Sequence, residues 1–136
     1  QLHTMEGDVL EVVTKFLAQR LQSLQALGVA AQRVVLDPGI GFGKTVAQNF
    51  QLLARQADLL RLGRPVLAGW SRKSALGAAL TQDGQVPQPA QRQVASVAAA
   101  LLAVERGASV VRVHDVKETA EALQIWLAMH QHAEAR

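Results

Sequence analysis

With 49% hydrophobic and 18% charged residues, the 136-residue chain excludes a disordered protein and is long enough for one domain with a core. Its 14 basic and 11 acidic residues are scattered along the sequence, so the formal net charge of +3 forms no basic run for nucleic acid. The absence of cysteine excludes disulfides and zinc-thiolate sites and favours a cytoplasmic protein, and no run of about 20 apolar residues predicts a membrane span.

The first part of the chain predicts a helix, a strand and a second helix. Apolar residues recur every three or four positions over 8–27, and Gly28 is a suitable helix end. The short β-branched segment 33–37 predicts a buried strand that Pro38-Gly39 ends. Helical periodicity returns over 46–62.

The second part repeats this order. A strand is predicted over 65–69, a short helix over 71–80, a helix rich in alanine over 90–106, a strand over 109–113 and a last helix over 115–130. Short apolar strands separated by helices indicate parallel pairing. The sequence therefore predicts an α/β fold of parallel βα units over residues 1–136. An open doubly wound sheet and part of a (β/α)₈ barrel both fit, and a complete barrel needs about 250 residues.

The segment LDPGIGFGKT, residues 36–45, has the glycines and the Lys-Thr pair of a phosphate-binding loop. Its spacing argues against that interpretation, because a Walker loop requires glycine where this chain has Pro38. The dinucleotide-binding fingerprint G-x-G-x-x-G also fails, since the glycines here follow G-x-G-x-G. We interpret Lys44 and Thr45 as the start of the next helix.

Polar side chains follow all the predicted strands. Asp37 ends the first, the sequence Ser71-Arg72-Lys73-Ser74 follows the second, and the third carries Arg112 and His114. Active sites of parallel α/β folds lie at the carboxyl ends of the strands, so these residues are candidates for a common site. Arg112 and His114 are two positions apart and therefore point to the same face, as a cationic pair suited to an anion.

Structural roles for some of these residues remain open. Asp37 fits a turn-starting residue before Pro-Gly. Ser71 fits a helix N-cap, and the amides of residues 72–74 would then form a helix N-terminus that attracts a carboxylate or phosphate. Asp115 and Glu118 have the spacing of a capping box, which gives them no catalytic role.

Three segments in this order, LDPGIGFGKTVAQNFQLL, PVLAGWSRKSALG and VVRVHDVKET, resemble the C-terminal signature segments of the dihydropteroate synthase family. The resemblance extends from about Asp8 to Met129. Arg92 and Ser96 lie where the family has an R-x-x-G-S/T stretch, and Ala95 replaces its glycine. The resemblance implies the C-terminal part of a (β/α)₈ barrel, with about three strands and four to five helices.

The resemblance also implies an activity, the condensation of p-aminobenzoate with 6-hydroxymethyl-7,8-dihydropterin diphosphate. Matched position by position, Asp37 would accept hydrogen bonds from the pterin and Lys73 would reach the pterin's oxygen and ring-nitrogen side. Arg112 and His114 would bind the diphosphate and stabilise its growing charge. Lys73, Arg112 and His114 are thus the expected catalytic residues.

Further substrate-binding residues are implied in the same segments. Ser74 would receive the carboxylate of p-aminobenzoate, with Arg72 beside it. Phe42 would pack near the pterin, and Gly69 would let the ring approach the backbone. Ser71, in the same S-R-K-S segment, is expected among the substrate-binding residues.

The resemblance covers the C-terminal half of the family, whose N-terminal half supplies an asparagine for Mg²⁺ and two mobile loops. We therefore expect Mg²⁺ in the full-length enzyme, no metal ligand in this chain and an inactive isolated fragment. A homodimer through the late helices is implied, with small-molecule substrates and neither nucleic acid nor membrane as partners. A non-catalytic pterin- or anion-binding half-barrel and a pterin-dependent methyltransferase relative are the alternatives.

Overall fold

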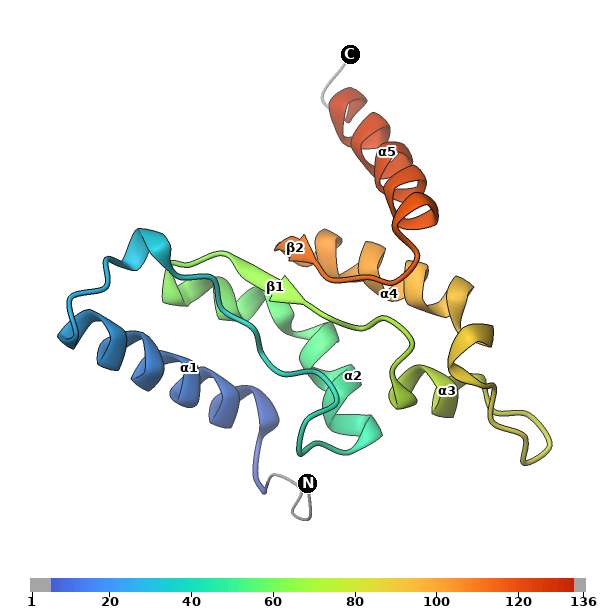
Figure 1. The fold of residues 1–136 in the computed structure, drawn as a ribbon, viewed down its shortest axis with the longest axis horizontal. Coiled ribbons are helices and arrows are strands. Elements are labelled where there is room, and N and C mark those ends of the chain that lie inside the picture. Colours follow the sequence, from blue (N-terminus) through green and yellow to red (C-terminus); the bar gives the residue numbers. More distant parts are fainter. Residues whose placement is uncertain (1–5, 134–136) are drawn as a thin grey trace.

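The computed structural model describes residues 6–133 as helices packed around a small parallel sheet (Figure 1). The α-helices and strands, in chain order, are α1 (Val9–Ala26), α2 (Val46–Ala54), β1 (Val66–Ala68), α3 (Ser74–Leu80), α4 (Gln93–Glu105), β2 (Ala108–Val111) and α5 (Val116–His132). The 3₁₀-helices are η1 (Ala31–Arg33), η2 (Gln56–Leu62) and η3 (Pro89–Gln91). The predicted order of elements is confirmed, and several boundaries differ.

The sheet pairs β1 with β2 in parallel, as predicted, and Val66 lies opposite Ala108. The predicted strand 33–37 is reduced to a single parallel bridge between Leu36 and Val66. Leu36 donates its N–H to the Pro65 carbonyl, and the Leu36 carbonyl accepts from Leu67, both at 2.8 Å. The η1 turn before this segment and Pro38 after it leave little extended backbone for a ladder, since proline has no N–H to donate.

The segment before Asp37 nevertheless has the side-chain alternation of a strand. Val34 and Leu36 are buried, whereas Val35 and Asp37 are exposed. A period of two places alternate side chains on opposite faces of an extended chain. The inward pair joins a core that α1, η2 and the two strands share, where Leu59 and Val66 are fully buried. Asp37 is thereby directed away from the core.

The predicted helix 46–62 is divided at Arg55 into α2 and η2. The reason is the burial pattern of the second half. Gln56 and Leu59 are buried and Leu62 is half-buried, a spacing of three residues that matches the turn of a 3₁₀-helix, about three residues. In an α-helix of about 3.6 residues per turn these side chains would drift off one face.

The last two helices pack differently from each other. Small residues of α4, among them Ala99 and Ala103, are buried, and α4 contacts both β2 and α5. Among the described residues of α5, Thr119 is the one that is buried. Figure 1 shows α5 extending away from the rest of the molecule, where Ile125 and Met129 are 73% and 58% exposed.

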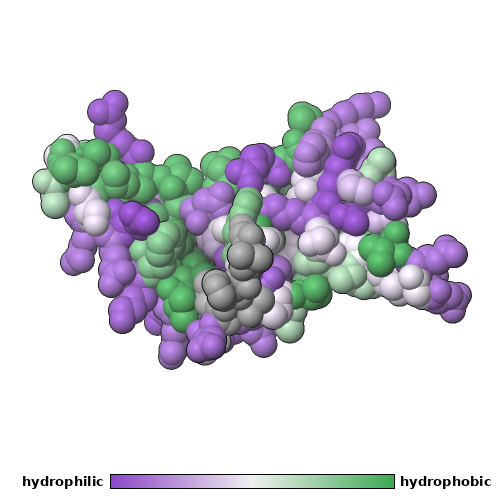
Figure 2. All heavy atoms as spheres, turned by 60° about the horizontal axis from the view of Figure 1, so that its bottom comes forward, coloured by the Kyte–Doolittle hydropathy of each residue, from purple (hydrophilic) through white to green (hydrophobic). Residues whose placement is uncertain are grey.

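Apolar side chains are also exposed on α1, including Phe16 and Leu24, and Leu27 is exposed at its C-cap. Figure 2 shows hydrophobic areas in green on the left of the molecule, beside hydrophilic side chains in purple. None of the helices within residues 6–133 combines the length and apolar composition that a membrane crossing requires.

Candidate active site

The polar residues that follow the strands lie side by side, as the sequence predicted. The guanidinium NH1 of Arg112 lies 3.7 Å from Oδ2 of Asp37. Oγ of Ser71 lies 2.7 Å from Nδ1 of His114. The ammonium of Lys73 lies 5.0 Å from the centre of the Phe42 ring, within the range of a cation–π contact. Each contact joins residues that follow different strands or the bridge segment.

Two neighbouring hollows contain most of the predicted site residues. A cavity of about 190 Å³ is lined by Gly69, Ser71, Lys73, Arg112, Val113 and His114. Arg112 and His114 line this cavity together with Val113, just beyond the end of β2. A second cavity, of about 300 Å³, is lined by Asp37, Phe42 and Lys44 with apolar residues of α1. The Asp37–Arg112 ion pair lies where the two sets of residues meet.

The glycine-rich loop is held closed by its own side chains. Lys44 donates from Nζ to the carbonyls of Gly39, at 2.7 Å, and Phe42, at 2.9 Å. The buried amide of Asn49 accepts from the Gly41 N–H at 2.8 Å. Because the Lys44 ammonium is turned into the loop, it does not extend toward a phosphate as a Walker lysine does. This contact agrees with the rejection of a nucleotide-binding loop.

Asp37 divides its two carboxylate oxygens between two functions. Oδ1 accepts from the Gly39 N–H at 2.9 Å, which is the turn role that its position before Pro-Gly predicted. Oδ2 faces Arg112. The turn therefore orients the carboxylate, and one oxygen is left for recognition at the site.

Lys73 is anchored on the glycine-rich loop. Its ammonium donates to the carbonyl of Ile40, and a Cβ at Gly41 would lie 3.2 Å from its Cδ. Gly41 has a φ of +87°, so that glycine serves both the turn and the close approach. Burial lowers the pKa of the Lys73 ammonium, the nearby Arg112 and Lys44 add to this effect, and Asp37 opposes it.

At Gly69 the structure shows a different close approach from the expected one. A Cβ there would lie 2.7 Å from NH2 of Arg112, so the guanidinium occupies the space that a side chain would fill. Gly69 thereby allows Arg112 to reach across β1 toward Asp37.

The S-R-K-S segment forms a turn that α4 supports. Arg72 has a φ of +59°, which is unusual for a residue with a side chain. Its N–H donates to Oγ of Ser96, and its carbonyl accepts from NH1 of Arg92, both at 2.8 Å. Arg92 fits there because residue 77 is a glycine. A Cβ at Gly77 would lie only 2.7 Å from Nε of Arg92. Sequence motifs singled out Arg92 and Ser96 but did not reveal that they hold this turn.

The predicted helix N-cap at Ser71 is wrong. The α3 helix begins at Ser74 with Lys73 as its N-cap, so Ser71 is not a cap. Of the amides expected to bind an anion, that of Arg72 donates to Ser96 and that of Lys73 to the Trp70 carbonyl, at 3.2 Å. The tight turn uses both donors within the protein.

The predicted capping box of the last helix is also wrong. Asp115 is the N-cap residue of α5, but its side chain makes no cap hydrogen bond. Its Oδ1 instead accepts from NH2 of Arg72 at 3.3 Å and from Nε2 of Gln93 at 3.1 Å. Arg72 is thus turned to Asp115, and neither Arg72 nor Ser74 lines the two hollows. A local pattern could not reveal a partner 43 positions away in the sequence.

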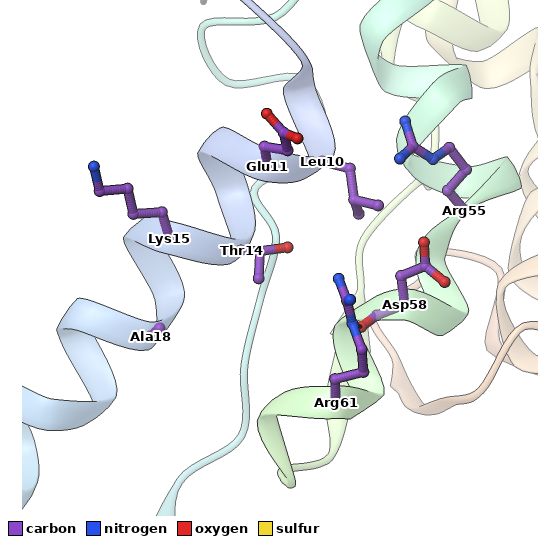
Figure 3. A pocket seen from close by; sticks show the side chains of 8 residues that line it. All are labelled: Leu10, Glu11, Thr14, Lys15, Ala18, Arg55, Asp58 and Arg61. Atoms are coloured by element: carbon purple, nitrogen blue, oxygen red, sulfur yellow. Dashed lines mark hydrogen bonds between the residues drawn. The ribbon is translucent and has the colours of Figure 1, made fainter.

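A third cavity, of about 450 Å³, lies between α1 and η2 (Figure 3). Leu10 and Thr14 point from α1 toward Arg55, Asp58 and Arg61. Cations and carboxylates are mixed there. None of the residues predicted from the sequence to bind substrate lines this cavity.

Within residues 6–133 no group of three or more His, Cys, Asp or Glu side chains is placed to hold a metal ion. The described residues therefore form no carboxylate- or imidazole-based metal site by themselves.

Comparison with known proteins supplies the context for this geometry. Residues 1–114 match the family model described as pterin binding enzyme. A dihydropteroate synthase of Neisseria meningitidis serogroup C is 45% identical over 130 residues, which cover 95% of this chain and 44% of the relative. One from Haemophilus influenzae is 40% identical over 121 residues, 89% of this chain and 42% of the relative.

Solved structures show the same similarity. Burkholderia cenocepacia dihydropteroate synthase, complexed with 7,8-dihydropteroate, matches with a TM-score of 0.90 and 49% identity over 98% of this chain and 49% of that one. The Xanthomonas albilineans enzyme with 4-aminobenzoic acid matches with a TM-score of 0.88 and 44% identity, over 93% of this chain and 45% of that one.

The chain spans about half the length of the curated relatives it matches. Its parallel strands and helices form part of the TIM-type barrel of these proteins, which confirms the predicted fold class. The resemblance found in the three sequence motifs is confirmed as well. The chain belongs to the family of pterin binding enzymes.

Proposed function

We propose that the protein containing this chain is a dihydropteroate synthase, a transferase of folate biosynthesis. One observation carries the proposal. The carboxyl ends of the parallel segments bring together Asp37, Lys73, Arg112 and His114, and the chain matches pterin binding enzymes. The names of its relatives favour the synthase over a methyltransferase.

The reaction would replace a C–O bond by a C–N bond. The amine nitrogen of p-aminobenzoate attacks the methylene carbon of the pterin, the C–O electron pair leaves with the diphosphate, and the nitrogen releases a proton to solvent. The arylamine is already nucleophilic, so positioning and stabilisation of the leaving group carry the catalysis.

Arg112 and His114 suit the leaving group because both side chains line one small hollow. Arg112 is 60% exposed, and its weak 3.7 Å pairing with Asp37 leaves guanidinium N–H groups to bind diphosphate oxygens. Negative charge that develops on the leaving oxygen is stabilised by donors that are already in place.

Asp37 and Lys73 suit the pterin. The Asp37 carboxylate, whose Oδ2 is engaged only by the 3.7 Å contact with Arg112, can accept hydrogen bonds from an amino and ring N–H edge. The ammonium of Lys73 binds the pterin by exchanging the Ile40 carbonyl for an acceptor on the ring. Phe42 is 56% exposed beside the Asp37 hollow, where it offers an apolar face to the ring.

Full-length protein with Asp37→Ala, Lys73→Ala or Arg112→Ala tests these roles through incorporation of labelled p-aminobenzoate into dihydropteroate. We expect each turnover rate to fall by about 100-fold or more, as when a group that stabilises developing charge is removed. Exposed residues outside the site supply matched controls, Asp58→Ala, Lys117→Ala and Arg33→Ala. Full activity in all three site variants would reject the assignment.

The full-length enzyme would use Mg²⁺ supplied with ligands from outside the described residues, act in the cytoplasm and form a homodimer. Support for the dimer comes from apolar side chains left exposed on α4 and α5, such as Val94 at 82% and Ile125 at 73%. Size-exclusion chromatography with light scattering tests it, and a monomer at micromolar concentration would reject it.

A further inference from the structure

Two successive residues of the turn after β1 are bonded to two successive residues after β2. Ser71 contacts His114, and Arg72 contacts Asp115. The second contact is the unexpected one, because Asp115 occupies the N-cap position of α5. Aspartate at that position ordinarily accepts a hydrogen bond from the first turn of its own helix. Here the carboxylate makes no such bond and is directed to Arg72 instead.

The backbone of Arg72 is fixed before its side chain is considered. Ser96 binds its N–H and Arg92 binds its carbonyl, which hold a left-handed φ of +59°. A residue in this strained conformation stays there only when its surroundings determine it. The position of the guanidinium is then decided by what binds the far end of the side chain.

Asp115 provides that binding. Its Oδ1 lies 3.3 Å from NH2 of Arg72, and Gln93 donates to the same oxygen at 3.1 Å. The Asp115 side chain is 12% exposed and that of Arg72 is 35% exposed, so water screens this pair less than a surface pair. Gln93, from the first position of α4, holds the carboxylate in place.

The pairing between Arg72 and Asp115 is incomplete. Nε of Arg72 and Oδ2 of Asp115 are both buried, and neither has a hydrogen-bond partner among residues 6–133. A guanidinium and a carboxylate that form two parallel hydrogen bonds would use these atoms. With one bond formed, the guanidinium keeps N–H groups for a ligand while its place remains fixed.

We propose that Asp115 is a positioning residue, which holds the guanidinium of Arg72 at the subsite for p-aminobenzoate. This role rests on the proposed synthase function and on the place beside that subsite that the family resemblance implies for Arg72, which lines neither of the two hollows. Asp115 does not touch the substrate. It determines where the cation that attracts the substrate's carboxylate is located, and it joins the two loops that follow β1 and β2.

Steady-state kinetics of the full-length protein test this role, with Asp115→Asn, Arg72→Met and the double variant. Asp115→Asn is expected to raise KM for p-aminobenzoate about tenfold, the size expected on loss of one charged hydrogen bond. KM for the pterin diphosphate should stay within about twofold, since its ligands are other residues. The double variant should be no worse than Arg72→Met, because Asp115 acts through Arg72.

Asp83→Asn, at an exposed turn, is the matched control and should leave both KM values unchanged. If Asp115→Asn does not fold, Gln93→Ala replaces it, with an expected rise of about twofold in KM for p-aminobenzoate that disappears in the Arg72→Met background. Additive effects of Asp115 and Arg72, equal rises in both KM values, or no change in KM would overturn the proposal.

The same experiment separates this proposal from the proposed function. A wild-type protein that forms no dihydropteroate overturns both. A wild-type protein that does, with Arg72→Met impaired for p-aminobenzoate and Asp115→Asn unimpaired, overturns the role of Asp115 alone. An unimpaired Arg72→Met also overturns it, because Asp115 would then have no subsite cation to hold.

Discussion

Ser71 and His114 are joined by two hydrogen bonds although 43 positions separate them. Oγ of Ser71 lies 2.7 Å from Nδ1 of the imidazole and accepts the backbone N–H of His114 at 3.1 Å. One buried hydroxyl thus fixes both the ring and the backbone of His114. With Nδ1 bound to Ser71, Nε2 is the ring nitrogen left to donate to an anion.

Ser71→Ala should weaken diphosphate binding by the full-length protein about three- to tenfold, in the range expected for one or two lost hydrogen bonds. The imidazole would lose the group that orients it, and the His114 N–H would lose its acceptor. Isothermal titration with inorganic diphosphate measures the change. Ser23→Ala, on the exposed face of α1, is the matched control, and an unchanged affinity in Ser71→Ala would contradict the role.

Gly77→Ala should destabilise the protein, although helix propensity alone predicts stabilisation by about 1 kcal/mol. A Cβ would lie 2.7 Å from Nε of Arg92 and push the guanidinium from the carbonyls of Arg72 and Pro87. We expect a net loss of about 1–3 kcal/mol, typical of overpacking, in denaturant unfolding. Adding Arg92→Ala should remove most of the further loss from Gly77→Ala. Stabilisation by Gly77→Ala would show that the contact is relaxed in solution.

Gln56→Ala should lower the free energy of unfolding by about 1–3 kcal/mol, because it leaves buried acceptors unsatisfied. The buried Gln56 side chain donates from Nε2 to the carbonyls of Ala103, at 2.9 Å, and Arg106, at 3.3 Å, at the end of α4. Gln51→Ala, exposed on α2, should change it by less than about 0.5 kcal/mol. Equal effects of the two substitutions in denaturant titration would show that the hydrogen bonds of Gln56 to the end of α4 do not stabilise the protein.

The contribution of Asp115 to stability should depend on pH. The hydrogen bond from Gln93 and the hydrogen bond and charge of Arg72 lower the pKa of the Asp115 carboxyl, against the opposing effect of burial. The folded state therefore favours the ionised form. This stabilisation is fully present above the ordinary pKa of 3.8 and is lost as pH falls through the lower folded-state value.

The difference in denaturation midpoint between wild type and Asp115→Asn should therefore be largest near neutral pH and shrink below about pH 4. Urea unfolding of the full-length protein at several pH values measures it. A difference that stays constant down to the acid limit of folding would show that the carboxylate charge is not involved.

Local patterns predicted some elements well and others poorly, for definite reasons. The apolar period of α1 placed it within one residue at each end, because one face packs on the core along its length. The division at Arg55 was missed because no proline or glycine marks it. It arises where Gln56 reaches the end of α4, a contact that sequence periodicity does not contain.

Sequence patterns alone predicted the order of elements, the parallel α/β class and the candidate residues Asp37, Lys73, Arg112 and His114. Strand alternation and the rule that sites lie at strand ends are local and geometric, and they need no partner to be known. The tertiary contacts determine which polar groups at the site remain available to bind a ligand. It bound the amides of residues 72 and 73 within the protein and turned Asp115 from its own helix to Arg72. A hydrogen-bond donor or acceptor can pair with any suitable group nearby in space, however distant in sequence. Which groups lie nearby is fixed only when the strands pair and the helices pack.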